Sequence, residues 1–514
     1  MPKFRPNWYP QGFLAPVFLA KQIQAGTFEY TLHILIDHVL DLSIFENRYK
    51  NEETGASAYD PRALLKVIFL AYSRGITSSR TMATCCRENM LFMAMSAYSM
   101  PHHTTLSNFI SSMEKEVSSI FLQVLSVCYK HGLIGSEMFA IDGCKLPSNA
   151  SKEWSGTMND FRRKKKKLET AIERILEKHK NQDATTANQE VKNQEEQYIY
   201  KLQKTVDKIS NWIDQNDERR GLSGKPIKSN ITDNESAKMH TSKGVMQGYV
   251  GVSAVDKKRH VILNAEAFGQ GYEQDLLKPT VEATRSNFTS IGYKGDIFDQ
   301  AKLLADNGYH SEDNMSFLFT ENIDGYIPDR DFRSRDPRYA GAEKYKEISK
   351  SKEKLRKGKQ FTPADFTFAE DLSFCICPAG ERMYRSGKNI KLKDYQACKF
   401  KGPKSSCLPC SLRSRCLRKP EKTEIRQVVY LTGKKRNGQQ RFTEKMKAKI
   451  DSNIGRAIYG LRLAIGEPPF AHIRSVMGLD RFSLRGKTKV NIQWNLFCIL
   501  HNIKKLHKYG GLLI

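Results

Sequence analysis

The chain has 514 residues, 39% of them hydrophobic, which is enough for about three domains or for one domain with large insertions. Its 83 lysine and arginine residues exceed the 56 aspartate and glutamate residues, for a formal net charge of +27. No apolar run approaches the roughly 20 residues of a membrane-spanning helix, and the first residues lack an apolar core followed by a cleavage site, so we expect a cytoplasmic protein without a membrane partner.

The positive charge favours a polyanionic partner, because cationic side chains neutralise phosphates and release their counterions. Nucleic acid fits this description best. A solvated basic surface, or affinity for anionic lipid, is the alternative that charge leaves open.

The first predicted elements are short helices between residue 59 and about residue 121. Asp60 can cap the first of them, Pro61 suits its first turn, and Leu64, Ile68 and Tyr72 fall on one apolar face. We interpret residues 1–130 as a helical N-terminal domain. Its basic residues suit a helix-turn-helix-like reader of DNA, although many helical segments without that function look the same.

Strand-like runs begin near residue 137 and alternate with helical segments up to residue 329. This order predicts a mixed α/β sheet domain over residues 131–514, interrupted by two insertions. The expected strands are residues 138–141, 250–255, 260–267, 302–305 and 324–329, with a helix over residues 273–288.

The first insertion, residues 155–225, has apolar residues at helical spacing in two stretches joined by a polar link over residues 181–188. This pattern predicts an antiparallel, coiled-coil-like helical hairpin. A basic run begins with Arg162, Arg163 and Lys164. The run can lie on DNA phosphates, although so dense a run is more often a solvated face.

The second insertion, residues 330–440, is predicted to be partly β and contains six of the eleven cysteines. Four thiolates satisfy the tetrahedral coordination of zinc, and such a site would stabilise an insertion that lacks a large core. Free structural cysteines or a redox pair are the alternatives. We favour Cys377, Cys407, Cys410 and Cys416 as zinc ligands, with Cys375 and Cys398 as possible substitutes.

Two expected strands each end in an aspartate, Asp142 and Asp306, and a glutamate, Glu467, lies in a later helical segment. Carboxylates suit Mg²⁺ or Mn²⁺, and two such ions can activate a nucleophile and stabilise the leaving oxygen of a phosphodiester. Each aspartate also suits an ordinary turn. Asp299 and Glu266 are weaker rivals for the same role.

Near the C-terminus, Tyr459, Arg462, Glu467 and Arg474 fall within one short segment. With Ala-Ile-Asp-Gly at residues 140–143 and Ala-Asp-Asn-Gly-Tyr at residues 305–309, this segment resembles the bacterial insertion-sequence transposases of the DDE type. The spacing between Arg462 and Glu467 departs by one residue from the family's commonest pattern, and Arg474 stands in place of a lysine.

The resemblance implies an RNase H-like catalytic core, in the branch of the family with a Cys-rich insertion before the catalytic glutamate. It implies Asp142, Asp306 and Glu467 as catalytic residues that hold two Mg²⁺ or Mn²⁺ ions. The expected activity is binding of terminal inverted repeats, cleavage of the transposon ends and strand transfer into target DNA, by a homodimer on double-stranded DNA in the bacterial nucleoid. The residues expected to contact DNA are Tyr459, Arg462, Arg474, Arg485, Lys487, Arg162, Arg163 and Lys164.

Two other functions remain open at this stage. One is a DNA-binding protein derived from a transposase, in which the acidic residues are only structural. The other is a metal-dependent nuclease of the same fold, which hydrolyses DNA without joining the ends to a target.

Overall fold

The computed structural model describes residues 18–49, 57–182, 189–220, 226–241, 244–339, 360–392, 395–434 and 441–511. The chain forms two compact units, one of Met1–Arg330 with Met446–Ile514 and the other of Asp331–Lys445. The first 17 residues, and most of the expected hairpin link, lie outside the described residues. Within the described part of the chain, no helix has the length and apolarity to cross a membrane.

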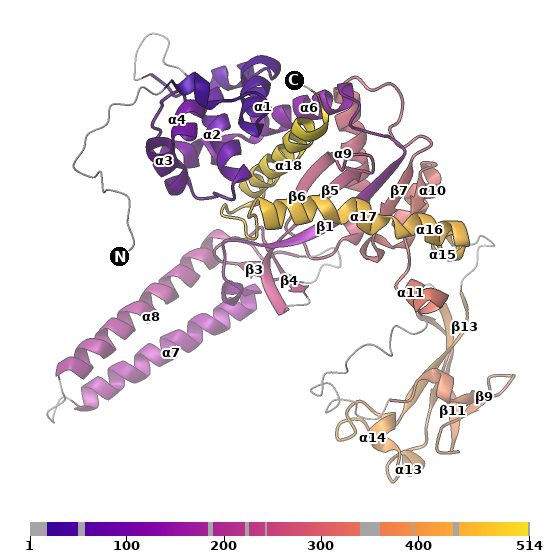
Figure 1. Ribbon diagram of the computed structural model, residues 1–514. Helices are drawn as coiled ribbons and strands as arrows, with labels where there is room; N and C mark the ends of the chain where they lie inside the picture. Colours follow the sequence, from indigo (N-terminus) through magenta and orange to yellow (C-terminus); the bar gives the residue numbers. More distant parts are fainter. Residues whose placement is uncertain are drawn as a thin grey trace, which may run out of the picture. The chain divides into compact units, whose positions relative to one another are not determined.

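Six α-helices open the first unit and share a core with the C-terminal helix α18 (Lys487–Tyr509) (Figure 1). Helix α2 begins as expected, with the Asp60 carboxylate accepting a hydrogen bond from the backbone of Arg62 and Pro61 as its first residue. The ring of Tyr72 stacks on Phe497 of α18 with centroids 4.4 Å apart. The six helices are α1 (Phe28–Ile34), α2 (Pro61–Ser73), α3 (Ser79–Glu88), α4 (Met90–Met95), α5 (His103–Ser112) and α6 (Glu114–Lys130).

A six-stranded sheet forms the centre of the first unit, with the order β4-β5-β1-β7-β8 and β6 paired to β5. Strand β1 pairs antiparallel with β5 and parallel with β7, which pairs parallel with β8. The mixed α/β fold is therefore confirmed. The strands are β1 (Met138–Pro147), β4 (Ala237–Thr241), β5 (Gly244–Asp256), β6 (Ile262–Phe268), β7 (Lys302–Ala305) and β8 (Asp324–Tyr326).

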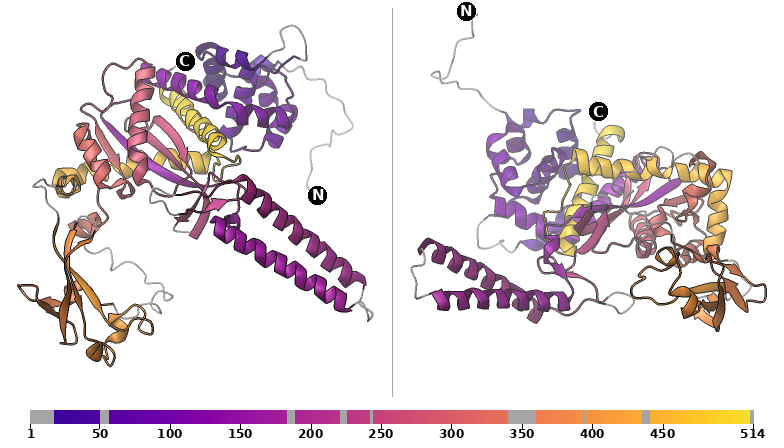
Figure 2. Two further views of the ribbon diagram at one scale, coloured as in Figure 1. Left: turned by 180° about the vertical axis from the view of Figure 1, so that it is seen from behind. Right: turned by 90° about the horizontal axis from the view of Figure 1, so that it is seen from below.

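Helices cover the sheet (Figure 1, Figure 2): α9 (Leu277–Ser290) packs on β5 and β6, α17 (Arg462–Ala471) on β1 and β5, and α18 on β6. Trp494 of α18 lies flat against Gly251, where a Cβ atom would come within 2.9 Å of the ring. His501 of α18 is buried, and its Nε2 lies 2.9 Å from the carbonyl oxygen of His260. The buried contact gives His501 a structural role in holding α18 against the turn before β6. Shorter helices follow at α10 (Glu312–Thr320), α15 (Phe442–Asp451) and α16 (Asn453–Gly460).

Between β1 and β4, helices α7 (Met158–Gln182) and α8 (Gln189–Gln215) lie side by side as a long hairpin (Figure 1, Figure 2). Phe161 of α7 packs edge-on against Trp212 of α8, in a small apolar cluster at the base of the hairpin. Strands β2 (Ser155–Gly156) and β3 (Ser229–Asn230) pair beside this base.

The second unit is built on a five-stranded antiparallel sheet with the order β13-β12-β11-β10-β9. Its core contains Phe366, Cys375, Met383, Cys398, Phe400 and Val428. The elements of this unit are α11 (Phe332–Arg335), β9 (Thr367–Phe368), β10 (Phe374–Ile376), β11 (Arg382–Leu392), β12 (Tyr395–Lys401), α13 (Lys404–Cys407), α14 (Arg413–Cys416) and β13 (Gln427–Lys434).

Candidate active site

The pairing of β1 with β7 brings Asp142 and Asp306 together. The two strands are parallel and in register up to Ile141 opposite Ala305, so the next residue on each strand is an aspartate. Strand β7 ends there, whereas β1 continues to Pro147 against β5. The expectation that β1 ends at Asp142 was wrong, because Cys144 and Leu146 continue to bury alternate side chains beyond it.

Helix α17 crosses this edge of the sheet and carries Arg462 and Glu467. The close approach depends on Gly466, since a Cβ atom there would lie 3.3 Å from Oδ2 of Asp142. Pro468 and Pro469 lie inside α17 and do not end it. A proline at residue 468 cannot donate to the carbonyl of Ala464, and that carbonyl is instead 3.0 Å from Nε2 of His260. The contact with His260 therefore satisfies the carbonyl group that Pro468 leaves without its helical partner, and α17 continues through the two prolines.

All three predicted acidic residues line one open cavity of about 1250 Å³. A fourth carboxylate, from Glu273, lines it as well. The charged side chains of the wall are Asp142, Glu273, Asp306, Glu467 and Asp480, with Lys145, Arg462 and Arg474 as the cations.

Arg462 lies between the two aspartates. Its Nη1 donates to Oδ2 of Asp142 at 2.9 Å and its Nη2 is 3.9 Å from Oδ1 of Asp306. The hydroxyl of Tyr459 lies 3.4 Å from the same Asp306 oxygen. Burial raises the pKa of Asp142, and the positive charge of Arg462 opposes that rise. The expected phosphate contacts of Arg462 and Tyr459 stay predictions, because the structure pairs both side chains with the site's own aspartates.

Sequence reasoning missed Glu273, which it treated as the start of a helix. The residue follows β6 and precedes a 3₁₀ turn that leads into α9. Burial raises the pKa of its carboxyl group, and the charge of Lys145 opposes the rise. No local signal distinguishes this glutamate from an ordinary residue at a helix start, since its neighbours in the site are more than a hundred residues away or on other elements.

The remaining predicted DNA-contacting residues do not all gather at the cavity. Arg474 is exposed on its wall. Arg485 is exposed, and its Nε donates to the carbonyl oxygen of Asn149 at 2.8 Å. Lys487 forms an ion pair with Glu266 at 3.1 Å. Glu266, the weaker candidate for a catalytic carboxylate, is therefore engaged in this ion pair. Arg162 and Arg163 are exposed on α7, and Lys164 lies 4.3 Å from the ring centroid of Trp154.

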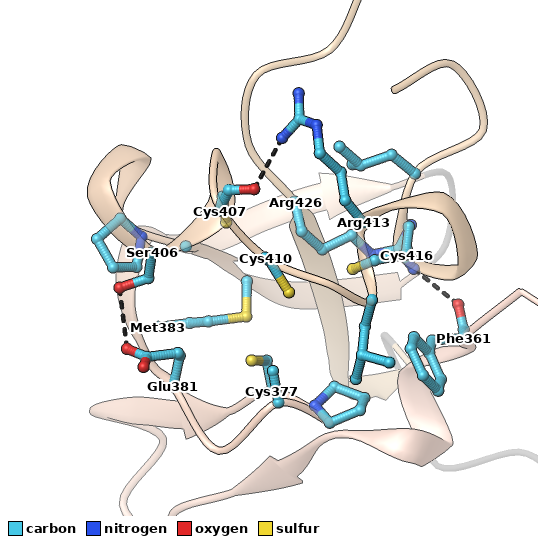
Figure 3. Close-up of a pocket in the computed structure, with 16 residues that line it drawn as sticks. Phe361, Cys377, Glu381, Met383, Ser406, Cys407, Cys410, Arg413, Cys416 and Arg426 are labelled. Atoms are coloured by element: carbon cyan, nitrogen blue, oxygen red, sulfur yellow. Dashed lines mark hydrogen bonds between the residues drawn. The ribbon is translucent and has the colours of Figure 1, made fainter. Parts of the chain in front are cut away.

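In the second unit, the four favoured cysteines line a single small cavity of about 30 Å³. Figure 3 shows the sulfur atoms of Cys377, Cys407, Cys410 and Cys416 directed into it. Burial raises the pKa of Cys416, and the three other thiols of the group raise it further. The possible substitutes Cys375 and Cys398 are instead buried in the apolar core of the sheet.

No group of three or more histidine, cysteine, aspartate or glutamate side chains in the described ranges is arranged so that it could hold a metal ion as it stands. In the open cavity, the guanidinium of Arg462 lies between the two aspartates. The four thiols share a cavity without being placed as a coordination shell.

Comparison with known families adds two matches. Residues 376–507 match a family described as the transposase DDE domain, and residues 17–112 match a transposase domain family, DUF772. The first match contains Glu467 and the second covers helices α1 to α5. No curated protein matches the chain. The two family matches together support a DDE transposase.

Proposed function

We propose that this protein cleaves the ends of a transposon and joins them to target DNA by two-metal-ion phosphoryl transfer. The observation that carries the proposal is the meeting of Asp142 and Asp306 where β1 and β7 separate, in one cavity with Glu467. Transposases act on DNA, and the matched DDE domain supports a DNA-cleaving enzyme.

We infer that the sheet is RNase H-like and that its two long interruptions are insertions. The inference is supported by a central strand, β1, flanked by an antiparallel β5–β6 pair and by parallel β7 and β8. In such an arrangement, the first aspartate lies on the central strand and the second follows its parallel neighbour. We also propose that residues 1–130 form an end-binding domain, which the transposase-domain match over residues 17–112 supports, and that a homodimer holds both ends in the bacterial nucleoid.

The carboxylates fit divalent cations by donor type, since Mg²⁺ and Mn²⁺ prefer oxygen ligands and retain water. Asp142, Asp306 and Glu467 would hold the ions. Ions bound there would activate a nucleophile and stabilise the leaving oxygen. The chain's own contribution is to hold the aspartates beside each other, with the positive charge of Arg462 opposing their mutual repulsion.

A direct test uses a DNA fragment that contains the coding region with its natural flanks, purified protein, Mg²⁺ and a recipient plasmid. Transposition predicts ends released from the fragment and then covalently joined to the plasmid. Release without joining would favour the nuclease. A shifted complex without cleavage would favour the DNA-binding derivative.

We propose that Arg474 binds a phosphate beside the scissile bond. Its side chain is exposed on the cavity wall, and a planar guanidinium can donate two parallel hydrogen bonds to phosphate oxygens. The Arg474→Ala protein should bind an end-containing duplex more weakly. When the logarithm of its binding constant is plotted against the logarithm of the salt concentration, the slope should be less negative by about 0.9, because one phosphate contact is lost. Lys278→Ala, which removes an exposed charge on α9, is the matched control. Equal slopes for both variants, measured by fluorescence anisotropy, would contradict this role.

We also propose a structural zinc ion in the second unit, held by Cys377, Cys407, Cys410 and Cys416. Their shared cavity, directed sulfur atoms and position beside a small core support it. Zinc is held by thiolates at about 2.3 Å, so metal binding would draw the four side chains together.

A further inference from the structure

Glu273 lies against both segments that carry the aspartates. A Cβ atom added at Gly308 would fall 2.4 Å from Oε2 of Glu273, and one added at Gly143 would fall 3.6 Å from Oε1. Neither glycine has a positive φ, so neither is required by a left-handed turn. Gly308 therefore provides room that the carboxylate of Glu273 occupies, and the distance at Gly143 shows that the same carboxylate lies beside the residue that follows Asp142.

The turn that carries Glu273 is tied to the turn that follows Asp306. Asn314, buried at the start of α10, donates from Nδ2 to the carbonyl oxygen of Gln274 at 2.6 Å and to that of Tyr309 at 2.8 Å. One amide group therefore fastens both turns to each other. Such support fixes the position of a functional side chain better than a free surface loop would.

Tyr309 provides an independent observation. Its side chain is completely buried, and its hydroxyl has no hydrogen-bond partner among the described residues. The hydroxyl would lie 3.5 Å from a Cβ atom at Gly143, and the charges of Glu273, Asp142 and Asp306 all act on it. Buried hydroxyl groups normally have a partner, so this unpaired donor is left for one of the site's own carboxylates to accept from.

The cationic side chains near Glu273 do not fully neutralise its carboxylate, so the site can accept a further cation. The nearest recorded cation, Nζ of Lys145, lies 3.8 Å from Oε1, beyond hydrogen-bonding distance. The whole cavity wall has five carboxylates and three cationic side chains. Like charges held this close repel one another, and a divalent cation relieves that repulsion.

We propose that Glu273 is a fourth carboxylate of the cation site and that Tyr309 is its positioning residue, whose hydroxyl donates to the carboxylate when a divalent cation is bound. This inference rests on the proposed function, because it concerns the same site. It adds a ligand that lies outside the predicted acidic triad and comes from the turn between β6 and α9.

The test measures Mn²⁺ binding to the full-length protein without DNA, by calorimetry and by the electron paramagnetic resonance signal of free Mn²⁺. The Glu273→Gln protein should bind Mn²⁺ about 10- to 100-fold more weakly than the wild type, and Glu273→Asp should recover part of the loss. Tyr309→Phe should weaken binding by a smaller factor. Glu266→Gln, in the ion pair with Lys487 outside the cavity, should bind Mn²⁺ as the wild type does.

Asp142→Asn separates the two ways in which the test can fail. Weak Mn²⁺ binding by Asp142→Asn together with wild-type binding by Glu273→Gln would overturn the role of Glu273 and leave the proposed function standing. Wild-type Mn²⁺ binding by both variants would overturn the proposed cation site itself. Thermal unfolding of each metal-free variant shows that the protein is folded, so that a loss of affinity reports on the ligand set.

Discussion

Asp142→Asn and Asp306→Asn proteins should cleave transposon-end DNA at least about 10²- to 10³-fold more slowly than the wild type, while binding that DNA almost as well. The amide keeps the shape of the side chain but removes the charge that holds a cation. Binding should persist because the carboxylates contact metal and not DNA bases. Cleavage of an end-labelled duplex and a parallel binding assay measure the two effects separately.

Asp299→Asn is the matched control for this experiment, because Asp299 is exposed, outside the cavity, and loses the same charge. Its cleavage rate should equal that of the wild type. Each active-site variant also leaves Arg462 with one carboxylate fewer, so its thermal unfolding must be compared with the wild type. Normal cleavage by a folded Asp306→Asn protein would remove Asp306 from the catalytic set.

The second large effect is expected from the cysteine cluster. Purified wild-type protein should contain about one zinc per chain, and Cys407→Ser combined with Cys410→Ser should remove it. Zinc binding stabilises small zinc-binding peptides by about 10–16 kcal/mol, whereas the core of this unit is small. The double variant should therefore expose the second unit to limited proteolysis and leave the first unit intact. Elemental analysis and the sizes of the proteolytic fragments measure these outcomes.

Cys375→Ala and Cys398→Ala are the controls, because both thiols are buried in the apolar core and away from the cavity of the other four. Burial raises the pKa of Cys375 to about 11, which favours the protonated thiol over a metal-binding thiolate. Both variants should keep their zinc even if they are less stable. A wild-type protein that is folded, resists protease and contains no zinc would show that the cysteines are ordinary free thiols.

Local patterns were sufficient to locate most elements of the sheet domain. The expected strand at residues 302–305 has the same limits as β7, and the aspartate and proline expected to begin a helix do begin α2. These signals are local: a buried strand is a short apolar run, and a helix start needs a cap and a permitted first residue. Strand β1 was predicted too short because an aspartate in mid-strand reads as a turn residue.

The surroundings of each acidic residue depended on distant parts of the chain. Arg462 is 320 residues from Asp142, and their ion pair forms only because α17 packs across β1. The resemblance implied that Arg462 contacts DNA, but a motif along a helix does not show which side chains lie opposite it in the fold.

Residue type and short-range order were enough to predict the α/β class, the positions of most strands of the larger sheet, the candidate acidic residues and the cysteine group. The folded arrangement alone reveals that Glu273 lies beside the two aspartates, that Gly308 makes room for it, and that the charges of these carboxylates act on the buried hydroxyl of Tyr309. The physical reason is that strand pairing and helix packing bring together residues far apart in the chain, and no local pattern encodes those distances.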